Sequence, residues 1–369
     1  MNRPRIATRL PLKQNHILGD LRRQIVTGTY PPGSRLPLRS ELQTHFNVST
    51  ATVQGALNRL IADGFVQAQG RLGTFVTRFP PHLSHYGLVF ARTPSVSDAR
   101  SRFFTALSSE AASLGQEVGR KIPVYYGVDG HTDSEVYQKL AIDVQAHRLA
   151  GLILTLLDHH ELDETPLMEE PDMPKVRITT GRQPGDVPAI CLDMSTFIDK
   201  ALDYLASKKR KRVALITVTG TRQEHLDYFR NGLESRKLTT RSYWMQSVGW
   251  PEVQWARNTV QLLLNPDQKV RPDALIILDD NVVEHCTAGL VQIGVDVPGD
   301  VEVVAHSNFP WSPPGVLPLR YLGFDAREVL LQAIENIDRQ RRNEKVPAVS
   351  IISARFEDEA SSISESTRR

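Results

Sequence analysis

The feature that most constrains this fold is an alternation, from Tyr86 onward, of short β-branched runs with amphipathic segments of helical length. The apolar runs lie at residues 87–90, 151–154, 213–216, 274–278 and 301–304. Such near-continuous apolar strands are buried on both faces, which is typical of parallel sheets connected by crossover helices. Because the pattern repeats near residue 195, we predict an α/β domain of two similar lobes over residues 86–356.

The first 78 residues differ from the rest of the chain in charge. They hold 11 Lys and Arg against 3 Asp and Glu, whereas the remaining residues hold 33 against 39. A compact segment with a net charge of +8 beside a mildly acidic body indicates a polyanion partner for that segment alone. The alternative is a solvated basic face without a partner.

The basic segment also has the pattern of a winged helix-turn-helix. Helical spacing of apolar residues predicts helices over about 13–27 and 38–46, and Ser49 is placed to cap a third helix that ends at Gly64. We expect the third helix to bury Val53, Leu57, Leu60 and Ile61 and to expose Thr50, Thr52, Gln54 and Asn58. Two strands, at 65–69 and 74–77, are joined by a turn with a basic tip and form the wing.

Two other stretches show neither the helical nor the strand periodicity of apolar residues. Residues 79–85 contain Pro80 and Pro81, which favour extended backbone, so we predict an extended linker that leaves the winged helix loosely oriented. Residues 357–369 are rich in Ser, Glu and Arg and are predicted to be a disordered tail. The expected domains are therefore 1–78, which binds DNA, and 86–356, which binds an effector.

Several motifs of the first segment match the pattern of the GntR family of bacterial transcription regulators, which this segment resembles. They are Gly33-Ser34-Arg35-Leu36-Pro37, Glu41-Leu42, Val48-Ser49, Thr52-Val53, Ala56-Leu57, Leu60, Gly64 and Gly73-Thr74-Phe75-Val76. A helix of this kind enters the major groove, where its exposed N-terminal side chains reach base edges. The resemblance implies DNA contacts for Arg35, Arg39, Ser40, Ser49, Thr50, Thr52, Gln54, Arg71 and Gly73. Capping alone is the alternative role for Ser49 and Thr52.

The sequence departs from that family at positions that face DNA. Ser40, Thr50 and Gln54 stand where the family usually has arginines, and Arg39 stands where an acid is common. Gln can pair with adenine, whereas Arg prefers guanine or phosphate. We therefore expect an operator that differs from that of a typical member. The alternative for Gln54 is that its side chain is solvated and does not contact DNA.

The two-lobed part resembles the ligand-binding domain of LacI/GalR regulators and periplasmic sugar-binding proteins. The landmarks, in order, are Ser101-Arg102-Phe103-Phe104, Gly151-Leu152-Ile153-Leu154, Ile190-Cys191-Leu192-Asp193, residues 225–233, Leu278-Asp279-Asp280-Asn281 and Val303-Val304-Ala305-His306-Ser307-Asn308. We expect each of them to lie just after a strand, at the carboxyl ends where open parallel sheets bind ligands. The sequence therefore predicts an effector site in a cleft between the lobes.

By this resemblance, several residues should contact the effector, which we expect to be a sugar. They are Phe103, Thr179, Asp193, His225, Asp280 and Ser307, with Arg92 and Arg182 nearby. Thr179 and Ser307 stand where acids are common, and His225 stands where Arg is common, so the effector need not be a neutral sugar. Core packing is the alternative role for Phe103, and helix capping is the alternative for Asp280.

Catalytic and metal-binding patterns are absent from the sequence. It has no nucleotide-binding glycine loop, no G-x-S-x-G elbow and no H-E-x-x-H pair. Cys191 and Cys286 are too few for a disulfide framework, and the adjacent His159 and His160 cannot share one helical face as metal ligands. We expect no enzyme activity, no cofactor and no metal.

No apolar run is long enough for a membrane span, and the N-terminus lacks the apolar stretch of a secretory signal, so we expect a cytoplasmic protein. These features together predict a homodimeric transcription repressor whose affinity for a near-palindromic operator is controlled by the effector. The alternative is a solute-binding module without DNA function, and an enzyme on the same scaffold is a more distant one.

Overall fold

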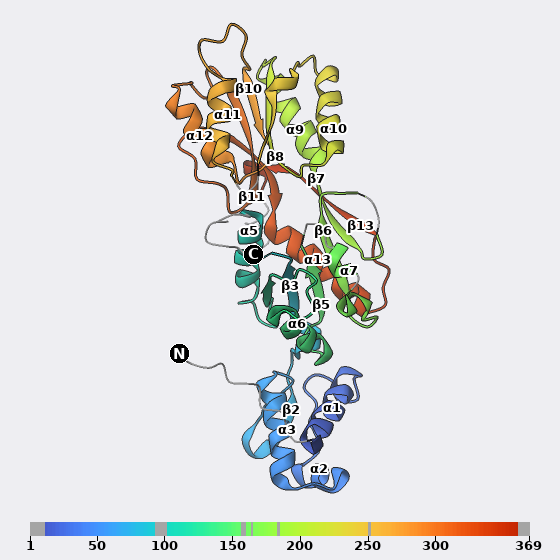
Figure 1. Ribbon diagram of the computed structural model, residues 1–369. Coiled ribbons are helices and arrows are strands. Elements are labelled where there is room, and N and C mark those ends of the chain that lie inside the picture. The colour runs from blue at the N-terminus through green and yellow to red at the C-terminus, as the bar shows by residue number, and fades with distance from the viewer. Residues whose placement is uncertain are drawn as a thin grey trace.

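The computed structural model describes residues 12–92, 102–155, 160–163, 165–182, 185–249 and 252–360. A winged helix, a short linker and two α/β lobes follow one another along an elongated molecule (Figure 1). The winged helix lies at one end, lobe one is in the middle, and lobe two is at the far end.

The winged helix has the predicted order of elements. Its elements are α1 (Leu12–Val26), α2 (Arg39–Phe46), α3 (Thr50–Ala62), the antiparallel strands β1 (Val66–Ala68) and β2 (Thr74–Val76), and the 3-10 turn η1 (Gly70–Leu72) between them. Asn47 ends α2 in the left-handed region with φ of 49°, and Ser49 caps α3 by accepting a hydrogen bond from the Thr52 backbone. The prediction that Ile61 is a core residue was wrong. Its side chain is 38% exposed, and Ala56 is buried in its place.

The linker is folded, which corrects the prediction of extended backbone. Residues Pro81–Ser84 form a helical turn, α4, in which the Ser84 hydroxyl donates to the carbonyls of Phe79 and Pro80 at 3.0 and 2.9 Å. The ring of His82 stacks on that of Phe65 with centroids 5.8 Å apart. Pro can begin a helical turn because its missing N–H would be unpaired there in any case.

Lobe one is built on a six-stranded sheet in the order β13-β7-β6-β5-β3-β4, with every pair parallel. The strands are β3 (Tyr86–Phe90), β4 (Val124–Tyr126), β5 (Gly151–Leu154), β6 (Lys175–Thr179), β7 (Ala189–Asp193) and β13 (Val349–Ser353). The helices are α5 (Arg102–Leu114), α6 (Glu135–Gln145), the short α7 (His160–Asp163) and α8 (Pro166–Glu169), and α13 (Ala326–Arg341). This lobe confirms the parallel architecture that the apolar runs predict.

Lobe two repeats the plan with the strand order β14-β12-β11-β10-β8-β9. Its strands are β8 (Val213–Val218), β9 (Met245–Val248), β10 (Ala274–Ile277), β11 (Glu302–Phe309), β12 (Arg320–Asp325) and β14 (Arg355–Phe356), the last antiparallel to β12. The helices are α9 (Met194–Ser207), α10 (Gln223–Ser235), α11 (Trp255–Leu263), α12 (Val283–Gln292) and the 3-10 turn η2 (Ser242–Trp244).

The chain passes between the lobes three times, after β7, after β12 and after β13. The segment after β14 differs from expectation. Residues 357–360 are helical rather than disordered, and Glu357 and Asp358 pair with Arg320 at 3.2 and 2.7 Å. The remainder of the predicted tail lies outside the described residues, as does His159.

Candidate DNA-binding surface and interlobe site

The N-terminal end of α3 presents hydroxyl and amide side chains on the surface of the winged helix. Ser49 and Thr50 are exposed, whereas Thr52 and Gln54 are half-buried. The Ser49 Oγ lies 2.9 Å from the Thr52 Oγ1, and Gln54 donates to the Asn58 Oδ1 at 2.7 Å. The predicted caps are therefore present. Both contacts join side chains within one turn of α3. They therefore leave the outer surface of this turn open to a ligand.

The remaining predicted DNA contacts lie on α2 and on the wing. Arg39 and Ser40 are exposed in the first turn of α2, and Arg71 is exposed in η1. Arg35 is exposed and forms an antiparallel bridge with Phe75 of the wing, and a Cβ on Gly73 would lie 2.9 Å from the Arg35 Nε. Gly73 has φ of 114°, a backbone conformation that favours glycine, whereas the exposed Arg35 side chain could move aside for a Cβ.

In the interlobe region, one group of predicted residues gathers around Asp193. This carboxylate is buried at the end of β7 and accepts hydrogen bonds from the Ser195 backbone at 3.1 Å and from Arg182 at 2.5 Å. His225, on α10 of lobe two, is buried, and burial lowers its pKa. Thr179 accepts from the Gly181 backbone at 3.0 Å. The structure therefore brings four of the predicted effector residues to the first crossover.

A second group lies at the carboxyl ends of β10 and β11. Asp280 is only 2% exposed and accepts from the Asn308 side chain at 2.8 Å. Burial, and then the neighbouring Asp279, raise the pKa of Asp280 to about 8. Ser307 is fully buried, with its hydroxyl 2.8 Å from that of Ser312. A carboxyl group with such a raised pKa is largely protonated near neutral pH and can donate a hydrogen bond.

Side chains that the sequence prediction did not select join the two lobes. The Arg102 backbone donates to the Asn281 side chain at 3.0 Å, and the Arg102 guanidinium lies 3.5 Å from Glu284. Trp311 donates its indole N–H to Glu110 at 3.1 Å. These pairs are separated by about 180 to 200 residues in sequence, so no local pattern could have revealed them.

Among the described residues, no polar side-chain contact is found for the other two predicted effector residues, Phe103 and Arg92. Phe103 is 8% exposed and packs with Phe104 in the core of lobe one, which favours the core-packing alternative. Arg92 is exposed just after β3. A cavity of about 280 Å³ lies elsewhere, between α10 and the β8–β9 edge of lobe two, and is lined partly by Thr217, Arg230 and Ser247.

Within the described ranges, no cluster of three or more His, Cys, Asp or Glu side chains could hold a metal ion. The same ranges contain no helix with the length and apolar character needed to cross a membrane.

Two stretches of the chain match known protein families. Residues 13–76 match the family of bacterial regulatory proteins named gntR, and residues 202–356 match the periplasmic binding protein-like domain. The first stretch covers the winged helix, and the second begins within α9 of lobe two. Both resemblances predicted from the sequence are thereby confirmed.

The curated relatives are transcription regulators. The HTH-type transcriptional repressor PurR of Vibrio cholerae serotype O1 is 24% identical over 205 residues, which are 53% of this chain and 60% of that protein. The arabinose metabolism transcriptional repressor of Geobacillus stearothermophilus is 21% identical over 330 residues, 84% of this chain and 88% of that protein. The HTH-type transcriptional regulator Rv1152 of Mycobacterium tuberculosis is 37% identical over 69 residues, 18% of this chain and 57% of that protein. The chain thus spans about 60% of the length of PurR.

Solved structures share the fold of the two-lobed part. A putative LacI transcriptional regulator from Bacillus cereus subsp. cytotoxis aligns with a TM-score of 0.58 at 19% identity, covering 74% of this chain and 96% of that one. A LacI family regulator from Lactobacillus casei, determined with bound glucose, aligns with a TM-score of 0.54 at 17% identity, covering 74% and 98%.

Proposed function

We propose that this chain, in which a GntR-type winged helix precedes a LacI-like two-lobed domain, is a transcription repressor whose operator affinity is set by a small effector. The observation that carries the proposal is the open polar surface at the start of α3, on a domain with a net charge of +8. In this proposal Gln54 and Thr50 face base edges and Arg71 faces phosphate. The chain acts in the cytoplasm, where chromosomal DNA is, and has no catalytic activity.

The effector in this proposal is a sugar or a related polar molecule bound between the lobes. Asp193, Asp280 and Ser307 supply hydrogen-bonding groups there, and Arg182 adds a cation. The similarity to an arabinose metabolism repressor supports a sugar. The histidine at position 225 and the threonine at position 179 give this site a different donor pattern from the sequence pattern usual in sugar-binding members.

We further propose a homodimer formed through the large domain. One winged helix reads few base pairs, and two copies related by a two-fold axis double the contact on a palindrome. Exposed apolar side chains on neighbouring helices of lobe two, Trp255 and Leu262 on α11 and Val291 on α12, fit a second copy of the same face. A monomeric mass in light scattering at micromolar concentration, with and without DNA, contradicts this part of the proposal.

The test of the proposed function uses the full-length chain. Repeated selection from a random duplex pool should enrich a near-palindrome, and a thermal-shift screen of sugars and sugar phosphates should identify one stabilising compound. A ligand at 100 times its dissociation constant stabilises by about 2.7 kcal/mol. Enrichment of no duplex, together with stabilisation by a sugar, supports the solute-binding module instead. Turnover of a screened compound supports an enzyme.

A further inference from the structure

Besides the linker, the winged helix is attached to lobe one at a second place, through Asp63. Asp63 follows α3 as its C-cap, and its side chain is only 6% exposed. The C-terminal end of a helix carries partial negative charge, so an ionised carboxylate there is unfavourable unless cations lie close to it. Arg22 of α1 lies 2.8 Å from this carboxylate, Arg59 lies 3.2 Å away, and Arg148 lies 3.0 Å away.

Of these three arginines, Arg148 belongs to lobe one. It lies in the turn between α6 and β5, where Asp143 accepts from its guanidinium at 2.9 Å and its backbone N–H donates to the Asp143 carbonyl at 2.8 Å. The Tyr125 hydroxyl donates to the same Asp143 carboxylate at 2.8 Å. A continuous chain of polar contacts therefore runs from the end of α3 to β4 in the sheet of lobe one.

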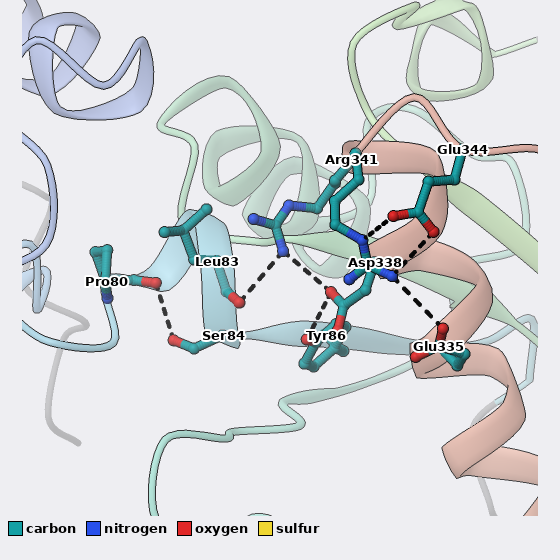
Figure 2. A network of polar contacts seen from close by, with 9 residues as sticks. Pro80, Leu83, Ser84, Tyr86, Glu335, Asp338, Arg341 and Glu344 are labelled. Carbon is teal, nitrogen blue, oxygen red and sulfur yellow. Dashed lines mark hydrogen bonds and ion pairs between the residues drawn. The ribbon is translucent and has the colours of Figure 1, made fainter.

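The linker forms the other attachment (Figure 2). Arg341, in the last turn of α13, donates to the Leu83 carbonyl at 3.3 Å and pairs with Asp338 at 3.0 Å. Asp338 in turn accepts from the Tyr86 hydroxyl at 2.9 Å, at the start of β3. A single attachment leaves rotation about the linker free, whereas two separate attachments fix the direction of α3 relative to lobe one.

We propose that Arg148 is a positioning residue for DNA binding. By pairing with Asp63, it holds α3 in one direction relative to lobe one, so that the two winged helices of a dimer match a single half-site spacing. The inference rests on the proposed dimeric DNA-binding function. Each inserted base pair rotates one half-site by roughly 35° about the duplex axis, so inserting half a helical turn turns it to the opposite side. A rigidly attached winged helix cannot follow that rotation.

The test compares four full-length proteins, namely the wild type, Arg148→Gln, Arg148→Lys and the matched control Arg120→Gln. Arg120 is also a lobe-one arginine, and its ion pair among the described residues is local, with Glu117 at 3.1 Å. The probes are the duplex that the wild type enriches from a random pool and the same duplex with five base pairs inserted between its half-sites. We expect the insertion to weaken wild-type binding by about tenfold or more.

For Arg148→Gln we expect weaker binding to the selected duplex and an insertion penalty that shrinks to about threefold or less. Arg148→Lys keeps a charge without the planar guanidinium and should lie between the two. Arg120→Gln should match the wild type. If Arg148→Gln weakens binding to both duplexes by the same factor, its role is merely structural and the proposal is overturned.

A second measurement does not depend on DNA. Trypsin cleavage after Arg78, which is exposed at the start of the linker, should be faster in Arg148→Gln than in Arg120→Gln because the winged helix is released from one attachment. Equal cleavage rates contradict the inference that Arg148 holds the winged helix against lobe one. Failure of the wild type to enrich any duplex counts against the proposed function, whereas the cleavage rates still decide whether Arg148 holds the winged helix.

Discussion

The start of α3 and the interlobe site both carry predicted ligand contacts, but they hold their polar side chains in different ways. Thr50 is exposed and Gln54 is half-buried, and each bonds to one neighbouring side chain within the winged helix. Asp193, Asp280 and Ser307 are almost fully buried, and each already has a hydrogen-bond partner. One surface is open, whereas the other is already occupied by the protein's own groups.

This difference in burial sets the cost at which each site can exchange its own hydrogen bonds for those of a ligand. An exposed side chain leaves an intramolecular partner at little cost because water or a base edge replaces it. A buried carboxyl that loses its partner without a replacement costs about 1–3 kcal/mol or more. An effector between the lobes must therefore replace contacts such as Asn308 to Asp280 or Arg102 to Asn281, and that exchange is what can change the relation of the lobes.

The largest effect that tests this comparison is expected from Asp280→Ala. It should abolish the effector-dependent change in operator affinity, a coupling of about 1–3 kcal/mol, because the residue lies at the carboxyl end of β10 beside Asn308. The DNA affinity without effector should stay close to that of the wild type, because Asp280 lies in lobe two and not in the basic N-terminal segment. Operator titrations with and without the compound found by thermal shift measure both quantities. If the variant keeps the effector-dependent change in operator affinity, Asp280 does not contact the effector.

The next effect is a pH dependence of stability. Because the folded pKa of Asp280 is raised to about 8, the folded state holds a proton that the unfolded state releases, and stability falls as pH rises toward 8. Burial lowers the pKa of His306 to about 4, whereas an unfolded histidine titrates near 6.5, so His306 contributes in the opposite direction until its unfolded form is neutral, about one pH unit above 6.5. The contribution of Asp280 alone to the free energy of unfolding should fall by up to about 1.4 kcal/mol per pH unit between pH 6.5 and 8, and the comparison with a variant at position 280 isolates it from the histidines.

Asp280→Asn resembles the protonated carboxyl and should remove most of that slope. Chemical denaturation at pH 6.5, 7.2 and 8 measures it, with Asp267→Asn as the control because Asp267 is exposed. A slope that is the same in wild type and in Asp280→Asn contradicts the assignment of the titrating group.

The two regions also differ in how far the sequence could predict them. The winged helix follows from local signals: the Ser49 cap, the turn at Asn47 and the hairpin at Gly70 and Gly73 are each defined within a few residues. The apolar strand runs likewise specify the two sheets. Contacts between Asp63 and Arg148 join residues 85 apart in sequence, and the helical turn at Pro81 depends on packing against the two flanking domains, so neither could be predicted from local pattern.

Within the DNA-binding surface, Gln54→Ala should relax the preference at one operator position by about 1–3 kcal/mol. The effect is confined to that position because a bidentate amide reads a single base, whereas the rest of α3 is unchanged. Binding of all single-base operator variants measures it. If every variant keeps its wild-type rank order, the Gln54 side chain is solvated in the complex.

The smallest effect is expected from Arg71→Ala in the wing. Arg71 is exposed, and no ion pair is found for it among the described residues, so its guanidinium is available to a phosphate. Loss of one phosphate contact should weaken binding by a similar factor on every sequence and flatten the slope of log affinity against log salt by about one unit. Arg23→Ala is the control, because Arg23 is also exposed but pairs with Asp20. A change confined to particular base pairs would instead place Arg71 in the minor groove, where the wing would read sequence.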